Sequence, residues 1–243
     1  MQIEARGLCK SFAAHDVVKD VSFSAEPGAV IGFLGPNGAG KSTTMRLLTG
    51  CLAADRGTAS IGGYDIDRNP LEARACLGYL PEAANGFTSL TILEFLIFAA
   101  EARGFHGKPC RDAISRVVDM IGLGPALGQT LGQLSKGWRQ RAWLGQALIH
   151  DPPVLILDEP TDGLDPLQKT HLRKLLAELS SRKTILMSTH ILEEAEELCD
   201  HLILLAEGRV VADTRKADVV DASGRLAPAF LRLTQPGAAH AVP

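Results

Sequence analysis

The chain has 243 residues, of which 46% are hydrophobic, so it can bury a core as one large domain or as a domain with an inserted subdomain. Its formal net charge of −3 offers no general attraction to nucleic acid or anionic lipid. Five scattered cysteines without a Cys-x-x-Cys pair indicate neither a disulfide framework nor a zinc site, and we expect a reducing, cytoplasmic setting. The N-terminal residues lack the apolar core of a signal peptide, and no apolar run approaches the ~20 residues of a membrane-spanning helix.

The first third of the chain is predicted to combine an antiparallel sheet with the start of an α/β core. Apolar and polar residues alternate over 3–23 with a turn-like break at 13–16, which favours short antiparallel strands. The apolar run 29–34 predicts a buried strand, and 58–61, bracketed by glycines, predicts another short strand.

A glycine-rich loop follows the strand predicted at 29–34 and precedes a predicted helix. It matches the P-loop pattern G-x-x-x-x-G-K-[ST], in which glycines let the backbone wrap a polyphosphate and the helix directs its positive end at the anion. An ordinary strand-to-helix turn that happens to carry a lysine is the weaker alternative, because the strand and helix lie where the motif requires them. Lys41 would reach the β- and γ-phosphates as a catalytic cation, and the Ser42 hydroxyl would ligate Mg²⁺. The predicted nucleotide-binding residues are Gly35, Asn37, Gly38, Ala39, Gly40, Lys41, Ser42 and Thr43.

Residues 84–150 are predicted to form a helical segment inserted into the core. After a strand at 76–81, apolar residues recur at helical spacing over 91–103, 110–121 and 137–150. Nearly all-apolar strands resume at 154–157, 184–188 and 202–205, as expected for parallel strands covered on both faces by helices such as 168–180 and 192–199. We assign 1–215 to one domain and 216–243 to a C-terminal tail whose last run, 235–243, should be frayed.

Two carboxylates end the strand predicted at 154–157. Asp158 stands where a P-loop protein needs an acid to hold Mg²⁺, and Glu159 could polarise an attacking water as a general base. Two solvated acids at a strand end are the alternative, which the complete P-loop makes weaker.

The segment 134–141, Leu-Ser-Lys-Gly-Trp-Arg-Gln-Arg, followed by 146–152 and the Asp-Glu strand, resembles the signature region of ATP-binding cassette (ABC) ATPases. The resemblance extends from about residue 2 to residue 215. It implies a P-loop NTPase core with an N-terminal antiparallel β subdomain and an inserted helical subdomain, and it implies ATP and Mg²⁺ as ligands.

Three further positions match motifs of this family. Phe12 matches the aromatic residue on which adenine stacks, Glu82 stands where most relatives have the Q-loop glutamine and would assist at Mg²⁺, and His190 matches the catalytic switch histidine that contacts the γ-phosphate. A phenylalanine near a strand end is more often plain core, Glu82 could be a solvated loop residue, and a histidine after a strand is usually structural or exposed. Agreement in register with the other motifs favours the functional assignments.

The signature also implies a second ABC ATPase subunit, either this chain itself or a homologue. In this family the signature serine and glycine bind the γ-phosphate of ATP held by the other protomer, and a helix beginning there would direct its positive end at that phosphate. The predicted contacts to the partner's ATP are Ser135, Lys136, Gly137 and the D-loop residue Asp165.

Lys136, Trp138 and Glu82 depart from the commonest family pattern and look like the branch that serves ABC type-2 exporters and gliding-motility transporters. This resemblance implies an exporter ATPase held at the inner face of the cell membrane by separate integral-membrane permease subunits, with no nucleic-acid partner. We expect the permease to dock on the groove around 85–98. An importer ATPase is less expected, because the long C-terminal regulatory domain of many importers is lacking.

Two other classes of function remain open at this point. A cassette ATPase that regulates ribosomes or DNA is the main alternative, although ribosomal members usually carry two cassettes and repair members carry long coiled coils. A nucleotide-binding scaffold without hydrolysis is disfavoured by Asp158, Glu159 and His190 together, while Glu82 leaves some room for it. The cargo is not readable, because specificity in such transporters lies in the membrane chains.

Overall fold

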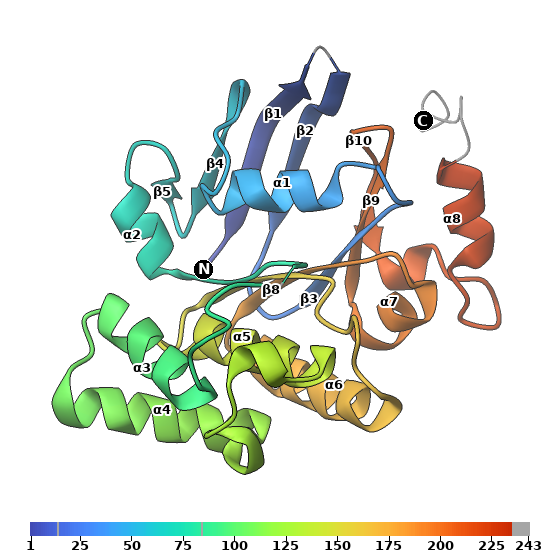
Figure 1. Ribbon diagram of the computed structural model, residues 1–243. Helices are drawn as coiled ribbons and strands as arrows, with labels where there is room; N and C mark the ends of the chain where they lie inside the picture. Colours follow the sequence, from blue (N-terminus) through green and yellow to red (C-terminus); the bar gives the residue numbers. More distant parts are fainter. Residues whose placement is uncertain (14, 84, 235–243) are drawn as a thin grey trace.

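The computed structural model describes residues 1–13, 15–83 and 85–234, and within them the strands form two sheets (Figure 1). The four-stranded sheet has the order β2-β1-β4-β5, and its pairs β1–β2, β1–β4 and β4–β5 are antiparallel. Its strands are β1 (Ile3–Phe12), β2 (His15–Ala25), β4 (Arg56–Ile61) and β5 (Tyr64–Asp65). This arrangement confirms the predicted N-terminal antiparallel sheet.

The six-stranded sheet has the order β10-β9-β3-β8-β7-β6. Its strands are β3 (Val30–Leu34), β6 (Leu77–Leu80), β7 (Val154–Asp158), β8 (Thr184–Thr189), β9 (His201–Ala206) and β10 (Arg209–Arg215). Strands β6, β7, β8, β3 and β9 run parallel, and β10 pairs antiparallel with β9. Because the carboxyl ends of parallel strands meet at one edge, the segments that follow β3, β6, β7 and β8 converge there.

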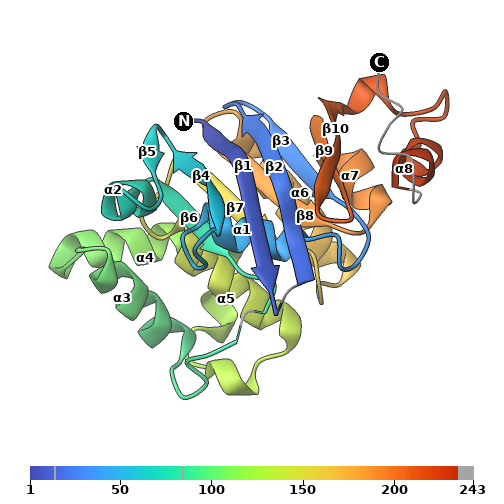
Figure 2. The ribbon, with the colours of Figure 1, turned by 90° about the horizontal axis from the view of Figure 1, so that it is seen from above.

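The two faces of this sheet bury different partners. Leu155 and Leu157 face a core that includes the helices between residues 92 and 180, whereas Ile31, Phe33 and Ile156 face a second core made with the P-loop helix and the antiparallel sheet. Helix α1 spans Lys41–Leu48, and seen from above it lies beneath β1 and β2 (Figure 2). Full burial of the parallel strands explains why their sequences are continuous apolar runs.

One expectation about these faces is wrong. Helices α6 (Pro166–Ser180) and α7 (Leu192–Leu198), predicted as examples of helices that cover both faces, contribute to the same core and pack on the same two strands, β3 and β8. The opposite face is covered by α1 and by the four-stranded sheet. A strand pattern records that both faces are buried, but it does not record which element buries each face.

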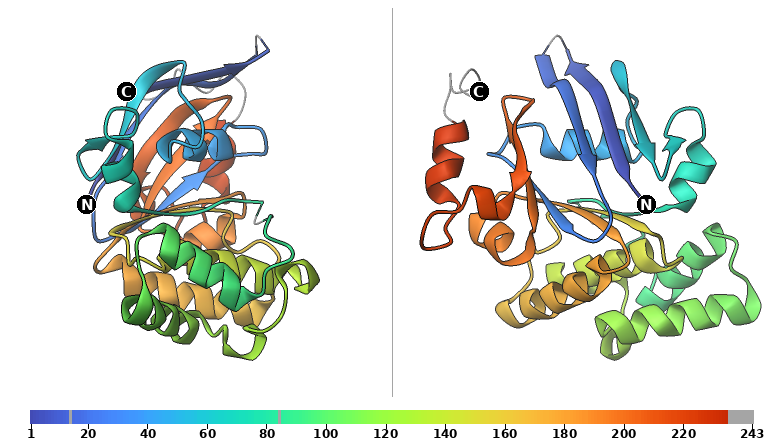
Figure 3. Two further views of the ribbon diagram at one scale, coloured as in Figure 1. Left: turned by 60° about the vertical axis from the view of Figure 1, so that its left-hand side comes forward. Right: turned by 180° about the vertical axis from the view of Figure 1, so that it is seen from behind.

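The helices α3 (Ile92–Ala102), α4 (Gly107–Ile121) and α5 (Lys136–Leu148) pack together at the end of the molecule away from the antiparallel sheet (Figure 3). Helix α3 begins with a capping box, in which Thr91 Oγ accepts from the Glu94 backbone N–H and Glu94 accepts from the Thr91 backbone N–H. All three helices lie within the predicted segment 84–150, whose first residue lies outside the described residues. The boundaries of this segment as a subdomain stay a prediction.

Several short elements lie outside the predicted pattern. These are β5, β10, α2 (Pro70–Ala75), α8 (Ala227–Thr234) and the 3₁₀ turns Gly124–Ala126, Leu131–Gln133 and Lys216–Asp218. Within the tail, α8 packs against β9 and β10 and buries Ala229, so the described part of 216–234 is ordered on the core (Figure 3). The predicted fraying of 235–243 lies outside the described residues. Among the helices in the described ranges, none combines the length and apolar character needed to cross a membrane.

Candidate nucleotide-binding site

The P-loop connects β3 to α1 at the convergent edge of the six-stranded sheet. Gly38 and Gly40 have φ of 81° and 98°, a region that side chains with a Cβ rarely adopt. A Cβ at Gly35 would lie 2.4 Å from the Leu205 carbonyl oxygen, and one at Gly40 would lie 2.7 Å from the Val17 carbonyl oxygen. The glycines are therefore required by the loop's own packing. Helix α1 begins directly after them, and its first N–H groups, at residues 41–43, point toward the position of a bound anion.

Lys41 is the cation of this loop. Its Nζ donates to the carbonyl oxygens of Gly35 at 2.8 Å and Pro36 at 3.3 Å, and the residue is 6% exposed. Burial lowers the pKa of Lys41, while the charges of Glu159, Asp158 and Glu82 oppose that shift. The ammonium group thus lies inside the loop with three carboxylates close enough to affect it.

Ser42, Glu82 and Asp158 meet beside the P-loop. The Ser42 hydroxyl lies 3.1 Å from Glu82 Oε2 and 3.2 Å from Asp158 Oδ1, and Asp158 Oδ1 also accepts from Ser188 Oγ at 2.5 Å. Burial raises the pKa of Asp158, and the Glu82 and Glu159 charges add to this, while hydrogen bonds from Ser188 and Ser42 oppose it. The three residues predicted at Mg²⁺ are therefore brought together from the loop after β6, the end of β7 and the start of α1.

This donor set fits Mg²⁺. The described residues hold no group of three His, Cys, Asp or Glu side chains able to bind a metal by themselves. One hydroxyl and two carboxylates, completed by phosphate oxygens and water, are the ligands that Mg²⁺ takes in nucleotide sites. Asp158 is buried and Glu82 is exposed, but both carboxylates approach the Ser42 hydroxyl, so a cation between them would relieve their mutual repulsion.

Glu159 and His190 form a pair directly after the neighbouring strands β7 and β8. His190 Nδ1 lies 3.0 Å from both Glu159 carboxylate oxygens. The backbone of Glu159 is held on two sides, because its N–H donates to Ser188 Oγ at 2.9 Å and its carbonyl accepts from Gln140 Nε2 at 3.2 Å. Glu159 has φ of 49°, an uncommon conformation for a residue with a Cβ, which is typical of strained functional positions.

The signature residues lie at the start of α5, and Asp165 lies at the start of α6. Ser135 caps α5 by accepting from the Trp138 N–H at 3.4 Å, and Asp165 caps α6 by accepting from the Gln168 N–H at 2.8 Å. A Cβ at Gly137 would lie 2.5 Å from Gln168 Oε1, so this position is closely packed. Lys136 Nζ pairs with Asp162 Oδ2 at 2.5 Å. Within the described part of the chain, none of these four residues hydrogen-bonds to the P-loop of the same molecule.

Phe12 ends β1, and its side chain is exposed. The residue is 44% exposed, and Lys10 Nζ lies 5.8 Å from the centre of its ring. Phe12 is therefore not a core residue, so the alternative that it only fills the core is wrong. Its role toward adenine stays a prediction.

Two side chains of this site were missed by sequence reasoning. Ser188 bridges Asp158 and the Glu159 N–H, and Gln140 anchors the Glu159 carbonyl. The only sequence signal for Ser188 is its place at the end of the strand that precedes His190. Gln140 carries no signal, because its contact joins α5 to β7 through the fold.

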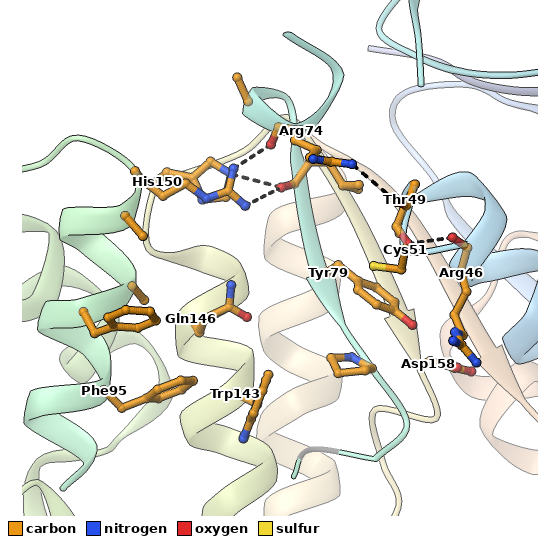
Figure 4. Close-up of a pocket in the computed structure, with 18 of the residues that line it drawn as sticks. Arg46, Thr49, Cys51, Arg74, Tyr79, Phe95, Trp143, Gln146, His150 and Asp158 are labelled. Carbon is orange, nitrogen blue, oxygen red and sulfur yellow. Dashed lines mark hydrogen bonds between the residues drawn. The ribbon is translucent and has the colours of Figure 1, made fainter. Parts of the chain in front are cut away.

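A groove of about 1210 Å³ runs from this site to the helices α3 and α5 (Figure 4). In Figure 4, Phe95 and Trp143 point into it from α3 and α5, and Arg46 and Tyr79 lie on the opposite wall. Phe87 contacts Phe95, Phe98 and Trp143, with ring centres 5.4, 5.1 and 6.2 Å apart. Phe98 is 50% exposed and Phe95 is buried, so only part of this aromatic cluster is plain core.

Known proteins resemble this chain in sequence and in fold. The family described as "ABC transporter" matches residues 18–162. The Nod factor export ATP-binding protein I of Paraburkholderia xenovorans is 40% identical over 213 residues, which cover 87% of this chain and 70% of that protein. The uncharacterized ABC transporter ATP-binding protein YxlF of Bacillus subtilis is 36% identical over 209 residues, covering 86% of this chain and 69% of that protein.

Solved structures agree with these sequence relatives. A structure described as the ATP binding subunit of an ABC transporter superposes with a TM-score of 0.86 at 32% identity and covers 96% of this chain and 99% of its own. A bacterial ABC transporter cassette solved as a dimer has a TM-score of 0.80 at 23% identity, covering 88% of this chain and 98% of its own, and shows the same fold. These likenesses confirm the predicted P-loop NTPase core and cassette architecture. The chain therefore belongs to the ABC transporter family and is an ATPase with the ATP-binding cassette fold.

Proposed function

We propose that the chain is the ATP-hydrolysing subunit of an exporter, in which two copies close around two Mg-ATP and drive transport through separate membrane-spanning subunits. The observation that carries this proposal is the Glu159–His190 pair, 3.0 Å apart, beside a P-loop whose serine faces two carboxylates. A scaffold that only binds nucleotide would not need a buried carboxylate oriented by a histidine.

In this proposal the P-loop and Phe12 bind ATP in one protomer. The exposed Phe12 ring stacks on adenine, the loop N–H groups surround the phosphates, and Lys41 neutralises their charge. Ser42, Asp158 and Glu82 would hold Mg²⁺, which neutralises charge on the β- and γ-phosphate oxygens when bound. The convergence of these three side chains on one point supports the assignment.

Hydrolysis requires that Glu159 takes a proton from the attacking water. The His190 ring lies against both carboxylate oxygens, so it limits the orientations of Glu159 and can contact the γ-phosphate with its other nitrogen. The carboxylate must be ionised to act as a base, and the Gln140 and Ser188 hydrogen bonds fix the backbone from which it projects.

The second copy supplies Ser135, Lys136, Gly137 and Asp165 to the ATP of the first. Ser135 and Lys136 are exposed and lie on the start of a helix whose positive end can approach a phosphate. Their separation from the P-loop of the same molecule supports a site completed in trans, and a dimer has been solved for a cassette of the same fold.

A permease subunit is the occupant we propose for the groove between the core and α3. Its aromatic part, with Phe87, Phe98 and Trp143, suits an apolar segment, and its other part, with Arg46 and Arg74, suits acidic side chains. Docking there would hold the chain at the inner face of the membrane. The export role of a 40% identical relative supports the exporter assignment.

Binding to membranes tests this proposal with a matched pair of variants. Phe98 and Leu231 are both exposed apolar residues, but only Phe98 lines the groove. Phe98→Ser should lose binding to native inner-membrane vesicles at least tenfold in sedimentation assays, whereas Leu231→Ser should bind as the parent does. Equal binding of the parent to protein-free liposomes would contradict a permease partner. Co-sedimentation with ribosomes or DNA in place of membranes would favour the regulatory alternative.

A further inference from the structure

A carboxylate on α7 lies buried outside the ATP contacts considered so far. Glu194 is 2% exposed, and its two oxygens accept three hydrogen bonds from side chains on three different segments. Thr161 Oγ1 donates to Oε2 at 2.6 Å, Thr189 Oγ1 donates to the same oxygen at 2.9 Å, and Lys169 Nζ lies 2.8 Å from Oε1. A buried charge is stable only when it is paired and hydrogen-bonded in this way.

Each of these three donors is close in sequence to a residue of the proposed catalytic centre. Thr161 follows Glu159 by two residues, and Thr189 directly precedes His190. Lys169 belongs to α6, the helix that Asp165 caps. One carboxylate therefore joins the segment after the proposed base, the segment before the switch histidine and the helix that follows the D-loop.

The two threonines are themselves buried, with exposures of 1% and 0%. Thr189 also accepts from the Ile191 N–H at 3.0 Å, so its hydroxyl holds the backbone on the far side of His190. These bonds restrict the two backbone turns from which Glu159 and His190 project. The 3.0 Å contact between those two side chains depends on both turns keeping their places.

We propose that Glu194 is a positioning residue for ATP hydrolysis, which sets the alignment of Glu159 with His190 and ties that pair to the D-loop helix through Lys169. This inference rests on the roles proposed above for Glu159 and His190. Glu194 does not touch the nucleotide in this scheme. Its effect is on the geometry of proton transfer, where a displacement of about 1 Å can cost ~10²-fold in rate.

Thr161 offers a test that leaves the buried charge paired. Thr161→Val keeps the shape but removes one hydrogen bond, while Thr189 and Lys169 still contact Glu194; Thr161→Ser keeps the hydroxyl. Thr170→Val is the matched control, because Thr170 lies exposed on α6 and its hydroxyl bonds the Pro166 carbonyl at 2.9 Å.

We expect Thr161→Val and Glu194→Gln to lower kcat by about tenfold or more, with KM for ATP and the Kd of a non-hydrolysable ATP analogue unchanged within about twofold. Thr161→Ser should regain most of the parent kcat, and Thr170→Val should keep all of it. Active-site titration would normalise kcat to the amount of folded protein. If Glu194→Gln does not fold, the comparison of Thr161→Val with Thr161→Ser still tests the positioning role.

A kcat of Thr161→Val within about twofold of the parent, or equal kcat for the Val and Ser variants, would overturn the positioning role. Glu159→Gln separates this failure from that of the proposed function. If Glu159→Gln hydrolyses ATP at the parent rate, the base assignment fails, whatever the Thr161 variants do.

Discussion

At the residue scale, Glu159 combines an uncommon backbone conformation with a carboxylate held against His190. A residue with φ of 49° is stable only because Ser188 and Gln140 bind its backbone from two sides. The protein's own contacts therefore orient the carboxylate, as an efficient general base requires.

Glu159→Gln tests this base. We expect the variant to bind Mg-ATP as the parent does while its hydrolysis rate falls ~10²–10⁴-fold, because the amide keeps the shape but cannot take the proton. Malachite-green release of phosphate would measure the rate, and light scattering at saturating ATP should find an accumulated dimer. Glu178→Gln, on the exposed side of α6, is the matched control and should hydrolyse normally. Near-normal turnover of Glu159→Gln would contradict the assignment.

Glu82 replaces the glutamine found at its position in most relatives, and its contact with Ser42 places it at the predicted metal. Its Oε2 lies 3.1 Å from the Ser42 hydroxyl. An ionised carboxylate only accepts hydrogen bonds and attracts a cation, whereas an amide also donates. Glu82 is exposed, but its contact with the Ser42 hydroxyl is more than a purely solvated loop residue would make.

We expect Glu82→Gln to keep most of the ATPase activity and to raise the Mg²⁺ concentration needed for half-maximal rate, because a neutral oxygen binds the cation more weakly. Glu82→Ala should loosen coupling to transport more than it slows hydrolysis. ATPase titrations with Mg²⁺, and transport per ATP in proteoliposomes, would measure these effects. Glu101→Gln on the exposed face of α3 should change neither. If both Glu82 variants keep the parent's Mg²⁺ dependence and the parent's transport per ATP, Glu82 is a bystander.

At the scale of elements, the junction between α5 and β6 contains a histidine that the fold keeps neutral. His150 directly follows the α5 C-cap, and its Nε2 donates to the Leu77 carbonyl at 3.1 Å. Burial lowers the pKa of His150 to about 4, and the nearby Arg103 charge adds to this. Arg103 reaches the same carbonyl at 3.3 Å, so a protonated imidazole there would face a like charge.

Acid should therefore loosen this junction. The unfolded chain takes up a proton near pH ~6.5, whereas folded His150 does so only near pH 4, so stability falls as the pH drops between those values. We expect this residue to lower the free energy of unfolding by about 1 kcal/mol between about pH 7 and about pH 5.5.

His150→Gln is the matched comparison, because its amide can still donate to the Leu77 carbonyl but cannot become charged. Urea unfolding at a series of pH values should give a shallower acid dependence for this variant than for the parent. Identical slopes over that range would show that His150 is not the group responsible.

At the scale of the whole molecule, the separation of the signature from the P-loop makes each proposed ATP site dependent on two chains. Ser135 lies on the start of α5, and Lys41 lies on the start of α1. A variant that disables one half-site should thus be complemented by a variant that disables the other. Lys41→Ala removes the phosphate cation, and Ser135→Asp adds a charge that repels phosphate while keeping an effective helix cap.

We expect each variant to be nearly inactive alone and their mixture to hydrolyse ATP faster than the sum of the separate rates. A mixed dimer contains one site with an intact P-loop and an intact signature, which supplies the regained activity. Mixing Ser135→Asp with Glu159→Gln should also regain activity, whereas mixing Lys41→Ala with Glu159→Gln should not, because Lys41 and Glu159 belong to the same half of the site. A mixture no faster than the sum would contradict a site shared between two copies.

Sequence alone determined the features that depend on local pattern. The P-loop, the Asp158–Glu159 pair and the apolar strands are contiguous motifs, so residue order is enough to locate them and to predict an α/β core. The helices α3, α4 and α5 and the strands of the parallel sheet were also readable, because their apolar residues repeat with one period over many positions.

Only the tertiary structure decided which distant groups meet. Glu82, Ser42 and Asp158 converge because parallel strands end at one edge, and Ser188 and Gln140 join them through contacts across strands and helices. The placement of α6 and α7 on one face, and the packing of α8, depend on which buried surfaces fit together. The network of Glu194 has the same origin, since its hydrogen-bond donors Thr161 and Lys169 lie 33 and 25 residues away in the chain, and no local sequence pattern encodes such distances.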